Sequence, residues 1–232
     1  MLYLVPTPLG NLEDITQRSL RVLREVRAVY CEDTRRTRVL LTHFGLHVPT
    51  LRYDDHNPRA VEQIIARLKA GEDLALVSDS GTPVISDPGL RLVSRAREEG
   101  LTVISLPGPS AVAAAVAGSG FPGDSFMFLG FLPRSDAKRR KALESTAGLG
   151  RTVVLYESPH RIVDLLGTAA EVFGPGTRSA VVRELSKVYE EWLTGTLEEI
   201  AGKLRSREKI LGEFVVLITP TNGKNHSHPE RL

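Results

Sequence analysis

Short apolar runs alternate with amphipathic stretches over the first 118 residues, and this alternation restricts the fold more than any other feature. Four apolar runs predict strands, at residues 2–5, 28–31, 74–77 and 101–106. Helical spacing of apolar residues predicts helices between and after them, at residues 15–26, 61–68, 90–99 and 112–116. Strands and helices that take turns in this way form parallel α/β units, so we expect neither an all-α nor an all-β domain.

A second set of elements follows the turn-like segment GSGFPGDS at residues 118–125. Strands are expected at residues 126–131, 152–156, 178–182, 189–194 and 214–219. Helices are expected at residues 138–146, 160–172 and 197–204. We therefore predict two α/β domains, residues 1–119 and residues 120–221. The polar segment 222–232 is poor in apolar residues and is predicted to be disordered.

Composition excludes several classes of protein. The single cysteine, Cys31, leaves no disulfide scaffold, and the six histidines lack metal-ligand spacing, so no metal is predicted. No apolar run is long enough to span a bilayer, and Met1 leads into LYLVP without a signal-peptide pattern. We therefore expect a cytoplasmic protein with no membrane partner. A net charge of +2 permits a nucleic-acid partner without requiring one.

Four loops rich in Pro and Gly each follow a predicted strand. They are PTPLGNLEDIT at residues 6–16, SDSGTPVISDPG at 78–89, PGPSA at 107–111 and YESPHR at 156–161. In open α/β sheets ligands bind outside the carboxyl ends of the strands, and helix starts there offer free N–H groups to polar or anionic ligands. Any one loop could be a well-capped turn and nothing more. Four together favour a shared small-molecule site.

Asp79, Ser80, Gly81 and Thr82 form the most specific of these groups. A carboxylate just past a strand can accept hydrogen bonds from a ribose or an amino group, and a glycine lets the backbone approach a ligand closely. The alternative is an Asx-turn that only shapes the loop.

Three charged motifs each allow two interpretations. In CEDTRRT, residues 31–37, the carboxylates of Glu32 and Asp33 lie beside Arg35 and Arg36, which suits acid–base chemistry next to phosphate-binding guanidiniums. A local salt-bridge cluster or a helix cap is the alternative. RELSKVYEE, residues 183–191, is either functional or a solvated hairpin tip. RSDAKRRK, residues 134–141, either binds a polyanion or forms the solvated first turn of a helix.

The motifs occur in one order and cover the chain to about residue 220. Together they resemble the bacterial small-subunit ribosomal RNA (cytidine-2′-O)-methyltransferase I family, within the tetrapyrrole methylase superfamily of S-adenosylmethionine (SAM) enzymes. The resemblance implies two α/β domains of the tetrapyrrole methylase type, SAM in the interdomain cleft, and a homodimer. Tetrapyrrole enzymes carry a G-x-G-P-G-D form of the first loop, whereas this chain has PTPLGN, which fits the RNA branch.

The resemblance also implies which residues contact SAM. By position in the matching motifs these are Pro8, Leu9, Asp79, Gly81, Thr82, Ile85, Ser110, Ala111, Leu155, Tyr156 and Gly212.

The implied reaction is an in-line attack of a ribose 2′-hydroxyl on the methyl group of SAM, in which positioning supplies most of the rate. Candidate general bases are Asp33, His160, Glu184 and Lys187, which the sequence does not rank. The expected partner is 16S rRNA in the small ribosomal subunit. Candidate phosphate contacts are Arg35, Arg36, Arg134, Lys138, Arg139, Arg140 and Arg161.

Two other functions remain open from the sequence. One is a SAM enzyme of the same superfamily that acts on a small molecule or a protein. The other is a non-catalytic RNA-binding assembly factor that kept the fold, against which the intact SDSGTP and PGPSA loops argue.

Overall fold

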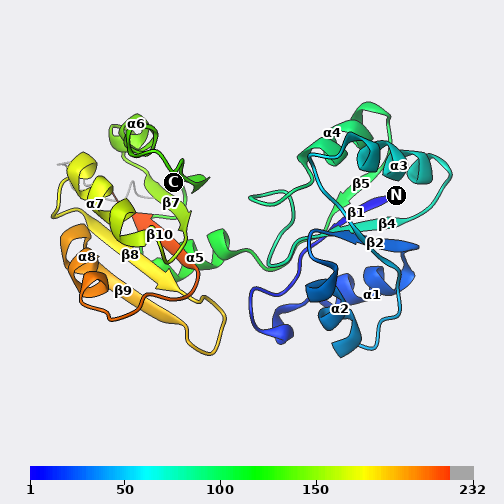
Figure 1. The fold of residues 1–232 in the computed structure, drawn as a ribbon, viewed down its shortest axis with the longest axis horizontal. Coiled ribbons are helices and arrows are strands. Elements are labelled where there is room, and N and C mark those ends of the chain that lie inside the picture. Colours follow the sequence, from blue (N-terminus) through cyan, green and yellow to red (C-terminus); the bar gives the residue numbers. More distant parts are fainter. Residues whose placement is uncertain (220–232) are drawn as a thin grey trace, which may run out of the picture. The chain divides into compact units, whose positions relative to one another are not determined.

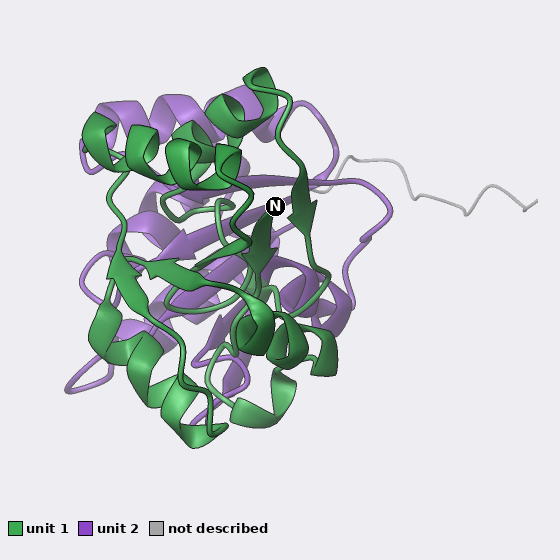
Figure 2. Cartoon of the chain, turned by 90° about the vertical axis from the view of Figure 1, so that its right-hand side faces the viewer, with its two compact units in different colours: residues 1–111 green, residues 112–232 purple. Residues whose placement is uncertain are grey.

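The computed structural model describes residues 1–219 and divides into two compact units, Met1–Ala111 and Val112–Leu232. Figure 2 colours the two units separately. The sequence placed the boundary after residue 119, whereas the units divide after Ala111. The reason is helix α5, Ala111–Ser119, which packs within the second unit: a Cβ at Gly118 would lie 2.9 Å from the Trp192 ring. The predicted tail, residues 222–232, lies outside the described residues.

The first unit is built on a five-stranded parallel sheet in the order β3-β2-β4-β1-β5. Its strands are β1 (Leu2–Val5), β2 (Ala28–Cys31), β3 (Thr50–Arg52), β4 (Leu74–Val77) and β5 (Val103–Ser105). The connections contain a 3₁₀ turn at Leu12–Asp14 and the helices α1 (Gln17–Glu25), α2 (Thr34–His43), α3 (Pro58–Lys69) and α4 (Leu90–Glu98). The parallel α/β prediction is confirmed, with β3 and α2 as additions to the predicted elements.

Helices cover both faces of this sheet (Figure 1). Side chains alternate along each strand, so one face packs on α1 and α2 and the other on α3 and α4. Val5 and Val29 belong to the first core, whereas Leu4 and Tyr30 belong to the second.

The second unit contains a mixed five-stranded sheet in the order β6-β7-β10-β8-β9, in which only β6 and β7 pair in parallel. Its strands are β6 (Phe126–Phe131), β7 (Thr152–Glu157), β8 (Arg178–Arg183), β9 (Glu191–Thr196) and β10 (Phe214–Ile218). Its further helices are α6 (Asp136–Ala147), α7 (Ile162–Phe173) and α8 (Leu197–Arg205). The prediction of a second α/β domain is confirmed.

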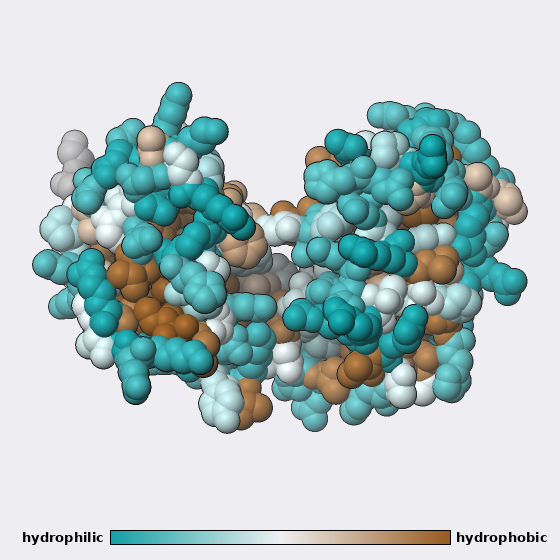
Figure 3. Space-filling view, viewed as in Figure 1, coloured by the Kyte–Doolittle hydropathy of each residue, from teal (hydrophilic) through white to brown (hydrophobic). Residues whose placement is uncertain are grey.

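The main core of the second unit joins one face of this sheet to α7 and α8, and includes Val216 of β10, Leu165 of α7 and Ile200 of α8. Thr196 and Glu199 form a capping box that starts α8 directly after β9. Hydrophilic side chains cover most of the visible face of each unit, and hydrophobic ones gather in limited patches (Figure 3). No helix within residues 1–219 is both long and apolar enough to cross a membrane.

Candidate functional site at the carboxyl edge of the first sheet

Four loops leave the first sheet from the same edge. Strands β2, β4, β1 and β5 are neighbours and parallel, so the segments that follow them all begin at their carboxyl ends. The chain leaves β1 toward α1 on one face and leaves the adjacent β4 toward α4 on the other. In open α/β sheets, ligands bind where neighbouring connections diverge in this way. The predicted loops at residues 6–16, 78–89 and 107–111 are therefore brought together.

Backbone hydrogen bonds fasten the loop after β1 to the loop after β4. The Thr7 N–H donates to the Gly81 carbonyl over 2.9 Å, and the Gly81 N–H donates to the Thr7 carbonyl over 3.0 Å. Two hydroxyls add to this bridge: Thr7 Oγ1 donates to the Ser78 carbonyl and Ser80 Oγ donates to the Leu9 carbonyl. The SDSGTP segment is therefore a fixed part of the sheet edge.

The loop after β5 is fastened to the same place. Thr82 Oγ1 donates to the Pro109 carbonyl over 2.9 Å. Gly81 has a φ of +81°, and a Cβ there would lie 3.0 Å from Leu9 Cδ2 and 3.5 Å from the Pro109 carbonyl oxygen. Only glycine fits without strain or crowding. The predicted cofactor positions Leu9, Gly81 and Thr82 thus lie in one locked cluster with the PGPSA turn.

Asp79 links the same cluster to the loop after β2. Its Oδ1 accepts the Asp33 backbone N–H over 3.3 Å, and its Oδ2 lies 3.7 Å from Arg36 Nη1. Its side chain is 24% exposed, so the carboxylate is accessible although partly covered.

The CEDTRRT motif forms both a helix cap and a salt bridge. Asp33 is the N-cap of α2 and accepts the Arg35 N–H over 2.9 Å. The Arg35 guanidinium donates two hydrogen bonds to the same carboxylate, from Nε over 3.1 Å and from Nη2 over 2.9 Å. These hydrogen bonds from Arg35 lower the pKa of Asp33 to about 2, so its carboxylate is a weak proton acceptor near neutral pH. The Arg35 side chain is 88% exposed.

Asp87 is a feature of this edge that sequence reasoning missed. Burial, followed by the negative charges of Glu32 and Asp79, raises the pKa of Asp87 to about 6. Asp87 does not cap the next helix, α4: the N-cap residue is Gly89, whose N–H donates to Asp55 Oδ2 over 3.0 Å. The sequence did contain a signal for Asp87: the loop that follows β4 ends in SDPG, which places a carboxylate in that loop.

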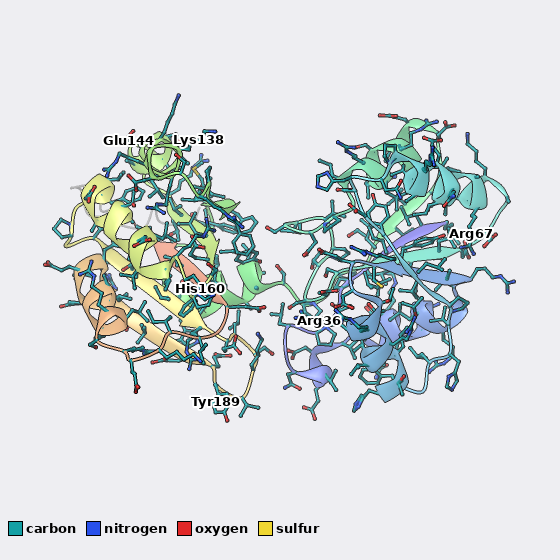
Figure 4. The ribbon with its side chains drawn as sticks, in the orientation of Figure 1. Arg36, Arg67, Lys138, Glu144, His160 and Tyr189 are labelled. Carbon is teal, nitrogen blue, oxygen red and sulfur yellow. The ribbon has the colours of Figure 1, made fainter. Side chains whose placement is uncertain are left out.

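In the second unit, the YESPHR segment holds a buried ion pair. Glu157 is 2% exposed, and its Oε1 accepts the Ser158 N–H over 2.7 Å and faces Arg161 Nη2 at 2.7 Å. Arg161 Nη1 also donates to the Leu132 carbonyl. Arg161 was predicted to bind phosphate; in the structure its guanidinium is the counter-ion of a buried carboxylate, and the phosphate contact stays a prediction. His160 is exposed just before α7 and is labelled in Figure 4.

Tyr156, near the end of β7, belongs to an aromatic cluster on β6 and β7. Its ring lies 4.9 Å from the Phe128 ring and 5.5 Å from the Phe131 ring, measured between centroids. Leu155 is fully buried in the core of this unit, so its side chain points away from solvent.

The connection between β8 and β9 brings Glu184, Lys187 and Gly212 together. Lys187 Nζ lies 3.0 Å from Glu184 Oε1 and 3.0 Å from Glu213 Oε2. Burial shifts both pKa values in the opposite direction, but the carboxylates of Glu184 and Glu213 hold the pKa of Lys187 above its ordinary value. The Glu213 N–H and then Lys187 hold the pKa of Glu184 below its ordinary value. Gly212 has a φ of +103°, and a Cβ there would lie 2.7 Å from Glu184 Cγ. This geometry was not visible from sequence spacing, because residue 212 is far from the motif.

Some of the basic side chains at the start of α6 are engaged in contacts within the protein, and others are exposed. Arg139 is 7% exposed, and its guanidinium donates to Thr168 Oγ1 over 3.0 Å and to Asp136 Oδ1 over 2.7 Å. The predicted phosphate contact at Arg139 is therefore corrected to a packing role between α6 and α7. Arg140 pairs with Glu171. Arg134 and Lys138 are exposed; Figure 4 shows Lys138 on α6, at the top of its unit in that view.

No group of three or more His, Cys, Asp or Glu side chains in the described part of the chain could hold a metal ion. The chemistry that the sheet edge offers is backbone hydrogen bonding, close approach at Gly81, and the carboxylates of Asp79 and Asp87.

Comparison with solved structures agrees with the two-unit fold. The chain aligns with uroporphyrin-III C-methyltransferase from Thermus thermophilus complexed with S-adenosyl homocysteine, at 19% identity and a TM-score of 0.65, over 93% of this chain and 96% of that one. It aligns with diphthine synthase at 17% identity and a TM-score of 0.73, over 95% of this chain and 90% of that one. These likenesses concern the fold.

Sequence comparison identifies closer relatives. The model of the tetrapyrrole (corrin/porphyrin) methylases matches residues 1–201. A protein of Mesorhizobium japonicum named ribosomal RNA small subunit methyltransferase I is 44% identical over 96% of this chain and 76% of its own length. Proteins of the same name from Hydrogenobaculum sp. and Escherichia coli O157:H7 are each 42% identical, over 95% and 94% of this chain and 96% and 77% of their own lengths. The chain therefore belongs to the tetrapyrrole methylase family and, within it, to the ribosomal RNA small subunit methyltransferase I group.

Proposed function

We propose that this protein transfers a methyl group from SAM to the 2′-hydroxyl of a cytidine ribose in 16S rRNA. The observation that carries the proposal is the locked sheet edge, where three loops of the family's motifs are joined through Thr7, Gly81 and Thr82. The relatives' name supports ribosomal RNA of the small subunit as the substrate. A cytoplasmic enzyme that acts as a homodimer on the small ribosomal subunit fits this function.

The residues present suit a cofactor such as SAM, which supplies an activated methyl group on a sulfonium cation. Gly81 brings backbone without a side chain against Leu9 and the Pro109 carbonyl, which lets a ligand approach the loop closely. Asp79 and Asp87 place carboxylates near the same loops, which suits a cationic ligand. We assign cofactor contacts in the first unit to Pro8, Leu9, Asp79, Gly81, Thr82, Ile85, Ser110 and Ala111. Leu155, Tyr156 and Gly212 stay predictions.

The contacts of the four candidate bases favour His160. The Arg35 hydrogen bonds leave Asp33 a weak base, and Lys187 is held as an ammonium by two carboxylates. Glu184 is likewise a weak base, because the Glu213 N–H and Lys187 lower the pKa of its carboxyl group. His160 is exposed, so its imidazole is accessible. An imidazole can take the proton of a ribose hydroxyl at neutral pH. His160→Ala should therefore lower kcat by about 10²-fold while leaving SAM affinity unchanged, as single-turnover and calorimetric measurements would show. An unaltered kcat would remove His160 from the reaction.

We assign phosphate contacts to the cationic side chains that the fold leaves accessible. These are Arg35, Arg36, Arg134, Lys138 and, beside Glu171, Arg140. Such contacts position RNA without reading its sequence, and their strength falls with added salt.

The proposal is tested by transfer of labelled methyl from SAM to small ribosomal subunits that lack the modification, with naked 16S rRNA alongside. We expect label in RNA and a 2′-O-methylated cytidine after nucleoside analysis. Label in a protein or a small molecule but not in RNA would replace this function with the alternative of another superfamily activity. Binding of RNA without any transfer would favour a non-catalytic assembly factor.

A further inference from the structure

The connection between β8 and β9, residues 184–190, presents two adjacent apolar side chains to solvent. Val188 is 94% exposed and Tyr189 is 74% exposed, the highest values among the large hydrophobic side chains of the described residues. Figure 4 shows Tyr189 pointing away from the strands of its own unit. Turn chemistry favours Gly, Asn, Asp and Pro at such a tip, so the turn itself does not require these two residues.

The backbone of this tip adopts an unusual and fixed conformation. Glu184 has a φ of +54° and Ser186 a φ of +64°, and these are two of the three non-glycine residues with positive φ among residues 1–219. Side chains in the left-handed region are strained, and such residues persist where their surroundings determine them, which is common at ligand-binding segments.

Hydrogen bonds on the first half of the loop account for this rigidity. Glu184 Oε1 accepts the Glu213 N–H over 2.8 Å and a hydrogen from Lys187 Nζ over 3.0 Å. The Glu184 N–H donates in turn to the Glu213 carbonyl, and the Lys187 N–H donates to the Glu184 carbonyl. The loop is thereby fastened to the segment that leads into β10.

The second half of the loop is held separately. One oxygen of the Glu190 carboxylate accepts the Ser186 N–H over 2.6 Å, and the other accepts the Trp192 indole N–H over 2.8 Å. Arg183 Nη2 donates to the Tyr189 carbonyl over 3.3 Å. The Val188–Tyr189 tip is therefore presented on a backbone that is held at both ends.

The charges around the tip do not suit a phosphate. Residues 183–191 contain two basic and three acidic side chains, and the Lys187 ammonium already contacts two carboxylates. An exposed aromatic ring with an apolar neighbour instead suits the flat face of an unpaired nucleobase. Proteins that recognise RNA by sequence stack splayed bases on aromatic side chains in this manner.

We propose that Tyr189, supported by Val188, stacks on an unpaired base of the RNA substrate and positions that RNA for methylation. The proposal rests on the proposed function, because it takes RNA as the substrate. Tyr189 is a positioning residue here: it touches a base and takes no part in proton or methyl transfer.

The test compares Tyr189→Ala with Tyr189→Phe in the full-length enzyme, using methyl transfer to RNA and RNA affinity over a range of salt concentrations. We expect Tyr189→Ala to raise KM for RNA by about 5- to 100-fold with kcat and SAM affinity unchanged, since stacking on one base is lost. Tyr189→Phe keeps the ring and should behave like the wild type. Leu149→Ala, at another exposed apolar side chain of the same unit, is the matched control and should change nothing.

Salt dependence separates stacking from charge contacts. Tyr189→Ala should weaken RNA binding equally at every salt concentration, whereas Lys138→Ala should reduce the slope of log affinity against log salt.

Three outcomes would overturn the inference alone: wild-type KM for Tyr189→Ala, loss of SAM binding in that variant, or a change in its oligomeric mass, which would make the tip a contact between copies. A wild-type enzyme that methylates no RNA would instead overturn the proposed function, and this inference with it.

Discussion

The carboxyl edge of the first sheet and the β8–β9 connection of the second unit both hold candidate functional residues, but different bonds fix them. At the sheet edge, reciprocal backbone hydrogen bonds between Thr7 and Gly81 join the loops, and a glycine leaves the space open. In the second unit, the carboxylates of Glu184 and Glu190 hold the loop through side-chain contacts. Backbone hydrogen bonds between loops do not depend on side-chain identity, whereas contacts through a carboxylate are lost when that one side chain is replaced.

The largest expected effect concerns the carboxyl edge of the first sheet, where backbone hydrogen bonds join the loops. Gly81→Val should weaken SAM binding by roughly 100-fold or more, because φ is +81° and the new side chain would meet Leu9 and the Pro109 carbonyl. Gly71→Val is the matched control: its φ is +86°, but no atom lies within 4 Å of its Cβ position. Calorimetric titration should find SAM affinity intact in the control. Equal losses in both variants would mean that strain in the fold, rather than the loop cluster, sets the affinity.

The second expected effect concerns the buried ion pair in the second unit. Arg161→Ala should lower the free energy of unfolding by about 3 kcal/mol, because the fully buried carboxylate of Glu157 loses its counter-ion. Denaturant unfolding would measure the loss. The double variant Glu157→Gln/Arg161→Ala removes both charges and should recover part of it. A stable Arg161→Ala protein with weakened RNA binding would instead support a phosphate contact at Arg161.

A smaller effect is expected at the exposed arginine of α2. Arg35→Glu should raise KM for RNA by roughly 10-fold and leave SAM affinity unchanged, since the 88% exposed guanidinium is available to a phosphate. Arg24→Glu makes the same charge change at another exposed position of the first unit. If both variants lose the same affinity, general charge rather than a phosphate contact at Arg35 is responsible.

The last expected effect is a pH dependence of stability at Asp87. Burial, Glu32 and Asp79 raise its pKa from an ordinary 3.8 to about 6 in the folded state. The folded state therefore binds the proton more tightly than the unfolded state, and stability falls as pH rises from about 4 to about 6. Asp87→Asn should abolish this trend. Melting temperatures of both proteins between pH 4 and pH 7 would check it, and parallel curves would contradict it.

Most of the fold could be predicted because apolar runs mark buried strands directly. β1, β2, β4 and β6 begin and end at the predicted residues. β3 was missed because its three residues are half-buried or exposed and carry no apolar pattern. Helix α2 was missed because its first turn, TRRT, has no apolar face and its charges suggested a binding motif instead. The predicted boundary follows α5, whereas the compact units divide before it, because contacts such as that of Gly118 with Trp192 are not visible in turn composition.

The candidate site was predictable where local sequence fixes the backbone. The Gly81 and PGPSA turns are examples, since their shape follows from glycine and proline. Pairings between distant residues were not predictable: the contact of Arg161 with the Leu132 carbonyl and that of Glu184 with the Glu213 N–H depend on tertiary structure. A charged motif alone does not distinguish a ligand contact from an internal ion pair.

The most direct test of the central claim, that the carboxyl edge of the first sheet holds the cofactor, is amide hydrogen exchange of the full-length protein with and without S-adenosyl homocysteine. We expect slower exchange in residues 6–16, 78–89 and 107–111 when the ligand is bound, because their backbone N–H groups face it or become buried. Unchanged exchange in all three segments, at ligand concentrations that saturate binding, would contradict the account.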